Sequence, residues 1–200
     1  MEGERALTQL QESGVDQQLL IRGLGGQGIL VSTKLIGAAA TKAGLFALHY
    51  AAYSGEVRGG WIECTLTVSD EPIHLPPTVS RSENCIVMHP AAFDMMAARL
   101  RPGGLFMVNS SLVERRDYPL DGRVVEIPAT EIGEEIGHEM AGTMAALGAY
   151  VELTGFLKLD LVMDALANVI PPHRANLIEI DRKALTAGAE FARAKVSVPA

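Results

Sequence analysis

Residues 18–42 read QLLIRGLGGQGILVSTKLIGAAATK, and this stretch decides the fold. The apolar run at 18–22 is typical of a strand that is buried on both faces of a parallel sheet. A glycine-rich turn, GLGGQG, follows at 23–28, and residues 29–42 have the pattern of a helix that Gly44 ends. A strand, a glycine turn and a helix in that order predict the first βα unit of a doubly wound α/β sheet.

The rest of the chain continues this alternation of strands and helices. A helix is expected to open at Pro90 and to span 91–100, and residues 102–104 are expected to form a turn. Helical patterns fill 130–195, with a break at Pro171 and Pro172. We therefore predict a Rossmann-like, doubly wound, mostly parallel sheet with helices on both faces and a helical C-terminal third. The further strands are expected at 45–50, 61–68, 84–89, 105–108 and 123–127.

Three glycines, Gly142, Gly148 and Gly155, lie in the predicted helical stretch 140–157. A glycine inside a helix costs about 0.5–1 kcal/mol relative to alanine. Close approach of another helix would offset that cost, and an early break in the helix is the alternative.

The composition limits the function further. Of the 200 residues, 48% are hydrophobic and 20 are glycine, more apolar content than one domain of this length needs, so part of the surface is expected to face a partner. The formal charge of −7 argues against nucleic-acid binding. The lack of a long apolar run predicts no membrane span and no signal peptide, hence a cytoplasmic protein. We expect one domain at 17–200 after an N-terminal extension at 1–16.

The glycine turn has the chemistry of an anion site. Gly23, Gly25 and Gly28 satisfy G-x-G-x-x-G between a strand and a helix, where backbone N–H groups and the helix N-terminus favour a phosphate or a carboxylate. Close packing of strand on helix is the alternative explanation. No Asp or Glu follows about 20 residues later, which disfavours ordinary NAD binding. Gln27 could reach a ligand or a neighbouring loop.

A second informative loop, YSGEVRGG, occupies residues 53–60. Because it follows the second predicted strand, it should lie at the carboxyl edge of the sheet near the glycine turn, where open α/β sheets bind ligands. Arg58 could pair with a phosphate or with a carboxylate of a partner, or Glu56 could pair with Arg58 at the surface.

With these residues in view, the chain resembles the gamma subunit, or gamma domain, of the 2-oxoacid:ferredoxin oxidoreductases. The resemblance rests on GLGGQGI at 23–29, on EVRGG at 56–60 and on CTLTVSDEPI at 64–73, with further similarity from GG at 103–104 to NSS at 109–111. It covers residues 18–170, most of the chain.

The resemblance implies a thiamine-diphosphate enzyme complex that decarboxylates a 2-oxoacid, transfers the acyl group to coenzyme A and passes electrons to ferredoxin. Thiamine diphosphate, Mg and iron–sulfur clusters are then expected on alpha, beta and ferredoxin-like delta subunits, since the two cysteines, Cys64 and Cys85, form no cluster motif. This chain would be inactive alone, with no catalytic or metal-binding residues, and a homodimer is possible in isolation. Coenzyme A could bind at the glycine loop, with the cofactor-binding residues Gly23, Gly25, Gly26, Gln27, Gly28, Tyr53, Glu56, Arg58, Gly59, Gly60 and Asn109.

Two other classes stay open at this point: a free-standing Rossmann-type, nucleotide-dependent oxidoreductase, and a non-enzymatic docking module. The substrate type looks closer to 2-oxoglutarate or a branched 2-oxoacid than to indolepyruvate. His89, at the end of a predicted strand, is interpreted as a residue that enters a helix through a local hydrogen bond.

Overall fold

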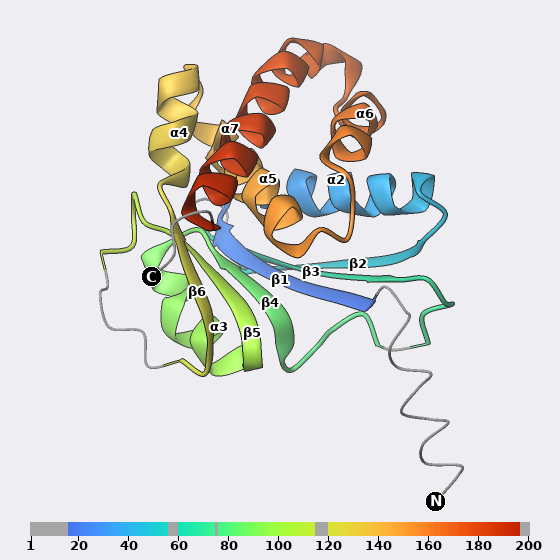
Figure 1. Ribbon diagram of the computed structural model, residues 1–200, viewed down its shortest axis with the longest axis vertical. Coiled ribbons are helices and arrows are strands. Elements are labelled where there is room, and N and C mark those ends of the chain that lie inside the picture. The colour runs from blue at the N-terminus through green and yellow to red at the C-terminus, as the bar shows by residue number, and fades with distance from the viewer. Residues whose placement is uncertain (1–15, 56–59, 75, 115–119, 197–200) are drawn as a thin grey trace, which may run out of the picture.

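The structure, a computed structural model, describes residues 16–55, 60–74, 76–114 and 120–196. Six strands form one sheet in the order β2-β3-β1-β4-β5-β6 (Figure 1). The strands are β1 (Asp16–Leu24), β2 (Phe46–Tyr53), β3 (Trp61–Ser69), β4 (Ser82–Val87), β5 (Leu100–Asn109) and β6 (Gly122–Ile127). All six predicted strands are present, and Asp16, expected in the N-terminal extension, already belongs to β1.

The prediction of a mostly parallel sheet is confirmed, with β3 as the exception. β1, β4, β5 and β6 are parallel neighbours, whereas β3 is antiparallel to both β1 and β2. The reason is the short connection between β2 and β3. A chain that returns after seven residues can only form an antiparallel hairpin, because a parallel pair needs a crossover of a dozen residues or more.

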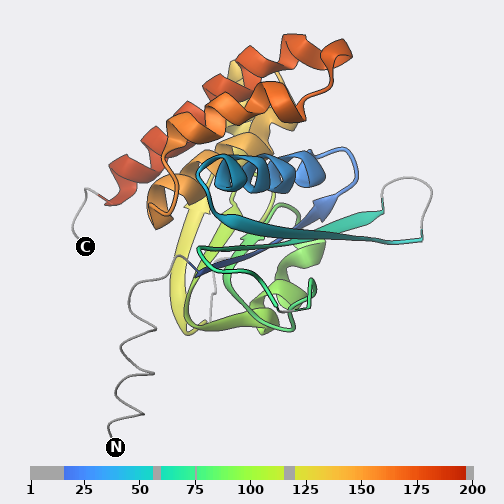
Figure 2. The same ribbon diagram turned by 90° about the vertical axis from the view of Figure 1, so that its right-hand side faces the viewer.

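The helices cover the two faces of the sheet unequally. α2, α5, α6 and α7 lie over one face and α3 lies under the other, as the two views show (Figures 1 and 2). The helices are α2 (Ile29–Lys42), α3 (Phe93–Arg99), α4 (Ala129–Ile136), α5 (Gly142–Thr154), α6 (Leu159–Val169) and α7 (Ile178–Val196), with short 3₁₀ helices at Pro90–Ala92, Glu139–Ala141 and Pro172–Leu177. The helical C-terminal third and its break at the proline pair are therefore as predicted.

The apolar run of β1 serves two cores. Leu19 and Ile21 point into the larger core under α2, α5 and α7, while Leu20 points into the smaller core against α3, and all three are at most 1% exposed. Successive side chains on a strand alternate between faces, so a strand covered on both sides needs apolar residues throughout.

The helix expected to open at Pro90 is present: it begins as a 3₁₀ turn and continues as α3 to Arg99, one residue short of the expected end. The turn expected at 102–104 was wrong, because these residues lie inside β5, where the pairing register with β4 shifts between Ser82 and Asn84. Gly103 has a φ of 76°, which lets the strand take up this irregularity without ending.

Candidate functional site

The glycine loop lies at the carboxyl end of β1, where the chain enters α2. From β1 the chain passes through α2 to β2 on one side of the sheet, while β4 lies next to β1 on the other side. The connections therefore diverge between β1 and β4, and in open α/β sheets this divergence opens a crevice in which ligands bind.

The glycines of the loop have different tasks. A Cβ on Gly23 would lie 3.0 Å from the side chains of both Ile29 and Met88, so Gly23 permits close packing. Gly26 has a φ of 98° and a Cβ there would meet nothing within 4 Å, so its backbone faces open space. Gly28, with a φ of 82°, is the N-cap of α2. Close packing, one of the two explanations considered for the motif, thus applies to Gly23, whereas Gly26 leaves open space beside the loop.

Gln27 turns back into the loop. The Leu24 N–H donates to Gln27 Oε1 at 2.7 Å, and Gln27 Nε2 donates to the carbonyl of Met88 at 3.4 Å. The hydroxyl of Thr143, at the start of α5, donates to the Gln27 carbonyl. Gln27 was expected to reach either a ligand or a neighbouring loop, and in the structure its side chain contacts the neighbouring segment at Met88.

Asn109 is completely buried at the end of β5 and joins three elements. Its Nδ2 donates to Thr130 Oγ1 at 2.9 Å and to the Met88 carbonyl at 3.4 Å, and its Oδ1 accepts the Thr130 N–H at 3.3 Å. Asn109 and Gln27 of the glycine loop thus donate to the same carbonyl, and Asn109 links β4, β5 and α4 at this point.

A cavity of about 250 Å³ opens on the α5 side of the loop. The start of α2 beside it has no side-chain cap and no acidic residue in its first turn, so its free N–H groups and dipole are available to an anion. Glu139 is the one charged residue among the described lining residues, so no basic side chain described there would neutralise a phosphate. The lining is Gly25, Gly26, Gln27, Met88, Thr130, Glu139, Met140, Gly142 and Thr143.

The 53–60 loop reaches the glycine loop as predicted. The Gly25 N–H donates to the Gly60 carbonyl at 2.8 Å. Tyr53 ends β2 with its side chain 55% exposed, and it aligns through Ile62 with Gly23, two strands away. Three predicted site residues, Glu56, Arg58 and Gly59, lie outside the described residues.

A charge network on the other side of the loop was not predicted. Arg22, only 7% exposed, contacts Glu63 at 3.0 Å and stacks on Trp61 at 4.1 Å from the ring centroid. Glu63 also pairs with Arg99 at 2.7 Å. Arg22 and Glu63 are direct cross-strand partners, and the signal in the sequence was one charged residue inside each of the two apolar stretches 18–24 and 61–69.

Arg22 and Trp61 of this network border a second cavity of about 250 Å³, whose lining is Arg22, Gly23, Leu24, Trp61, His89, Ala91 and Ala92. His89 accepts the Ala91 N–H through Nδ1 at 3.3 Å and caps the 3₁₀ turn, which confirms its interpretation as a helix-entry residue. The glycine loop therefore has one cavity on each side.

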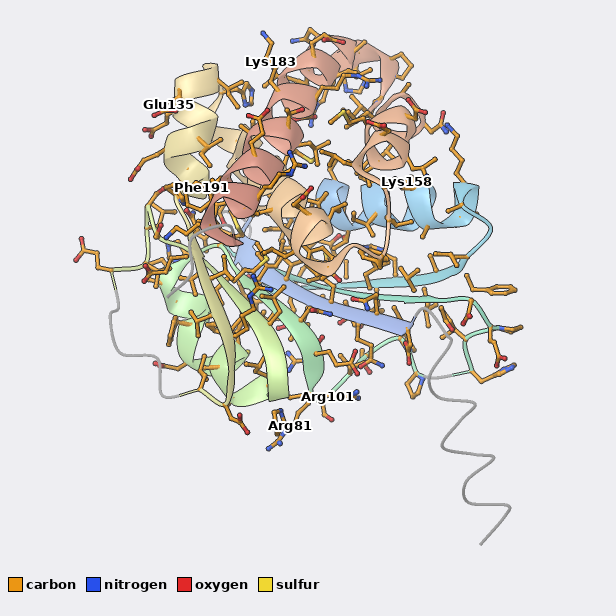
Figure 3. The ribbon with its side chains drawn as sticks, in the orientation of Figure 1. Arg81, Arg101, Glu135, Lys158, Lys183 and Phe191 are labelled. Atoms are coloured by element: carbon orange, nitrogen blue, oxygen red, sulfur yellow. The ribbon has the colours of Figure 1, made fainter. Side chains whose placement is uncertain are left out.

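The thiols do not belong to this site. Cys64 and Cys85 are both free and fully buried, and burial raises the pKa of both, that of Cys85 to about 12. Across the described segments, no three His, Cys, Asp or Glu side chains are grouped to hold a metal ion, and no helix is long and apolar enough to span a membrane. The basic side chains Arg81 and Arg101 lie at the amino-terminal edge of the parallel strands, away from the glycine loop (Figure 3).

The sheet order, the glycine loop at the divergence of the strands and the adjoining crevice define a doubly wound α/β domain with a crevice at its carboxyl edge. A family model described as pyruvate ferredoxin/flavodoxin oxidoreductase matches residues 18–191. The chain belongs to this family.

Individual relatives agree with this assignment. The 2-oxoglutarate synthase subunit KorC of Methanothermobacter marburgensis is 30% identical over 163 residues, which cover 78% of this chain and 87% of the relative. The crystal structure of the gamma subunit of keto/oxoacid ferredoxin oxidoreductase from Geobacter sulfurreducens superposes with a TM-score of 0.76 at 26% identity, covering 89% of this chain and 99% of that one.

The fold also occurs inside a longer chain. The 2-oxoglutarate:ferredoxin oxidoreductase of Magnetococcus marinus, solved with 2-oxoglutarate, coenzyme A and succinyl-CoA bound, superposes with a TM-score of 0.78 at 21% identity. The match covers 90% of this chain and 31% of that one, so there the same fold forms about a third of a larger polypeptide.

Proposed function

We propose that this chain is the gamma subunit of a thiamine-diphosphate-dependent 2-oxoacid:ferredoxin oxidoreductase and that it is inactive alone. The complex converts a 2-oxoacid to its acyl-CoA, releases carbon dioxide and passes electrons to ferredoxin. Membership of the family supports this function, as does the match to nearly the full length of a KorC subunit and of a gamma subunit.

The number of cysteines bears on which subunit would hold the iron–sulfur clusters. A four-thiolate iron–sulfur cluster needs four cysteines, and this sequence has two, both buried in strands. We therefore assign the clusters to a ferredoxin-like delta subunit, and thiamine diphosphate with its Mg to alpha and beta subunits. The role of this chain is to complete the assembly and to help bind coenzyme A.

The glycine loop is our candidate for a phosphate group of coenzyme A. One observation carries this assignment: the open backbone of Gly26 borders a crevice of about 250 Å³, and α2, which has no side-chain cap, begins three residues after Gly26. Because Glu139 lies in the same crevice, the anion would depend on N–H groups and on the helix dipole, with Arg58 or a partner subunit as the source of a cation.

A matched pair of glycines tests this assignment. Gly26 and Gly44 lie at opposite ends of α2, both have a positive φ, and a Cβ meets nothing within 4 Å at either. In the assembled complex, Gly26→Asp should weaken coenzyme A binding by about tenfold or more, measured by isothermal titration, because it places a carboxylate next to the anion. Gly44→Asp should not weaken it.

Gly26→Asn and Gly44→Asn serve as uncharged controls for backbone strain. If Gly26→Asp and Arg58→Ala both leave the affinity for coenzyme A unchanged, the loop has a structural role only, while the assignment of the chain as a gamma subunit stands on its own evidence.

The free-standing oxidoreductase is not favoured. Ala51, Ala52 and Tyr53 end β2 without the carboxylate that NAD-binding sheets place there. We expect the purified chain to show no turnover with a 2-oxoacid and an electron acceptor, and the reconstituted complex to show it with 2-oxoglutarate or a branched 2-oxoacid. NAD reduction by the chain alone would contradict this proposal.

A further inference from the structure

The two edges of the sheet differ in how they are protected. β6, one edge strand, is six residues long and carries Arg123 and Glu126. β2, the other edge, is eight residues long, reads FALHYAAY, and contains no Asp, Glu, Lys, Arg or Pro. Its register with β3 runs from Phe46 to Tyr53 without a bulge. Charges, prolines and bulges are the devices that keep an edge strand from pairing, and β2 has none of them.

The open side of β2 presents a defined set of backbone groups. The Ser54 N–H donates to the Trp61 carbonyl on β3 at 3.0 Å. Alternate residues of an antiparallel pair point their N–H and C=O groups to the same side, so the even-numbered residues of β2 face β3. The odd-numbered residues, Ala47, His49, Ala51 and Tyr53, therefore direct theirs away from the sheet.

Two large side chains of β2 also lack cover. Phe46 is 46% exposed and Tyr50 is 41% exposed, both on the face of the sheet opposite α2. In both views β2 forms the outer margin of the sheet (Figures 1 and 2). Large aromatic side chains on an unprotected edge strand indicate a surface that another strand covers.

We propose that a second copy of this chain covers the edge, with the two β2 strands paired antiparallel about a twofold axis so that two six-stranded sheets become one. The chain carries a net charge of −7, yet β2 carries none, so two copies can approach along this edge without placing like charges opposite each other. A twofold pairing also satisfies the outward groups of both copies at once and closes the assembly.

The outward groups fix the register. A twofold axis perpendicular to the sheet pairs residues of equal parity, and the hydrogen-bonded pairs must be odd-numbered. Pairing Ala47 with Tyr53 and His49 with Ala51 of the other copy uses all four outward residues, whereas a shift toward either end leaves some unpaired. This register places Tyr50 opposite Tyr50 of the second copy, on the axis.

The oligomeric state of the purified full-length chain tests the proposal. Sedimentation velocity and light scattering over a wide range of concentration should give a species of twice 21.3 kDa. Ala51→Pro removes an outward N–H without touching the β2–β3 ladder, and Tyr50→Lys places two ammonium groups on the axis. Each should raise the dimer dissociation constant by about tenfold or more. Leu112→Lys, at an apolar position with 37% exposure outside β2, should not.

Cross-linking checks the register. Directly opposed residues that are not hydrogen-bonded have Cα atoms about 4.5 Å apart, within reach of a disulfide. Tyr50→Cys should therefore form a covalent dimer on oxidation, while Phe46→Cys, about 27 Å from its counterpart in this register, should not. Circular dichroism confirms that each variant is folded.

Three results would overturn the proposal: a monomer at every concentration, a dimer that survives both Ala51→Pro and Tyr50→Lys, or association only with alpha and beta subunits. None of these results bears on coenzyme A binding at the glycine loop.

Discussion

Gln27 and Asn109, 82 positions apart in the chain, donate to the same acceptor: both side-chain amides lie 3.4 Å from the Met88 carbonyl. This shared carbonyl joins the glycine loop, the end of β4 and the end of β5 at one point, and Asn109 links it to the start of α4. The shape of the candidate coenzyme A crevice therefore depends on residues that themselves have few polar atoms left for a ligand.

Asn109→Ala should destabilise the protein by about 1–3 kcal/mol, because it leaves the partly buried hydroxyl and N–H of Thr130 without their partner. Gln27→Ala should cost about 1 kcal/mol by loss of the Leu24 contact. Urea denaturation of both single variants and the double variant measures the coupling. We expect an interaction free energy above about 0.5 kcal/mol, since the two amides share one acceptor. Strict additivity would contradict the common junction.

Gly148→Ala and Gly188→Ala should each destabilise the protein strongly, by about 3 kcal/mol or more. A Cβ on Gly148 would collide with the backbone of Leu185 on α7, and one on Gly188 with the backbone of Ala145 on α5. Gly37→Ala is the control: it lies inside α2, its Cβ would sit 3.6 Å from Leu66, and it should stabilise by about 0.5–1 kcal/mol. Thermal and urea unfolding distinguish these signs.

Glu63→Gln should destabilise the protein by about 2–4 kcal/mol, because it leaves the partly buried guanidinium groups of Arg22 and Arg99 without their carboxylate. The matched control is Glu83→Gln, which removes an equally short contact to Arg101 at the surface and should cost less than about 1 kcal/mol. Equal losses in urea denaturation would show that burial of the Arg22–Glu63–Arg99 network does not matter.

Asp181 gives stability a pH dependence. Burial raises the pKa of its carboxyl to about 6, against a partial opposing effect of His138. The folded state therefore binds this proton more tightly than the unfolded state, and stability falls as the pH rises from about 4 to about 6. Asp181→Asn should match the wild type below about pH 4 and be more stable by about 1 kcal/mol above about pH 6, after allowance for solvent screening. Asp160→Asn, at an exposed position, should change stability by less than about 0.5 kcal/mol at either pH.

The two thiols should be inert in the folded protein. Cys64 and Cys85 are fully buried, and burial raises the pKa of both, so neither supplies a thiolate near neutral pH. A thiol reagent at pH 8 should label neither residue until denaturant is added. Rapid labelling of the native chain would contradict the buried positions in β3 and β4.

The sequence by itself determined the class of fold and the place of the loop. Three local patterns sufficed: the apolar run at 18–22, the glycines after it and the helical period of Ile29–Lys42. Each can be recognised from residues that are close together in the chain. The glycines of the helical stretch 140–157 are also visible in the sequence. Only the structure separates Gly148, where two helices touch, from Gly155, which ends α5 with a φ of 65°.

Tertiary structure alone decided which residues meet. Arg22 and Glu63 are 41 positions apart and become partners because β3 folds back antiparallel onto β1. Gln27 and Asn109 converge on Met88 because β1, β4 and β5 end at the same edge of the sheet. The sequence also does not show which strand lies at an edge of the sheet. The strand order places β2 there, and an uncharged strand is open to pairing with another chain only when one of its sides has no neighbouring strand.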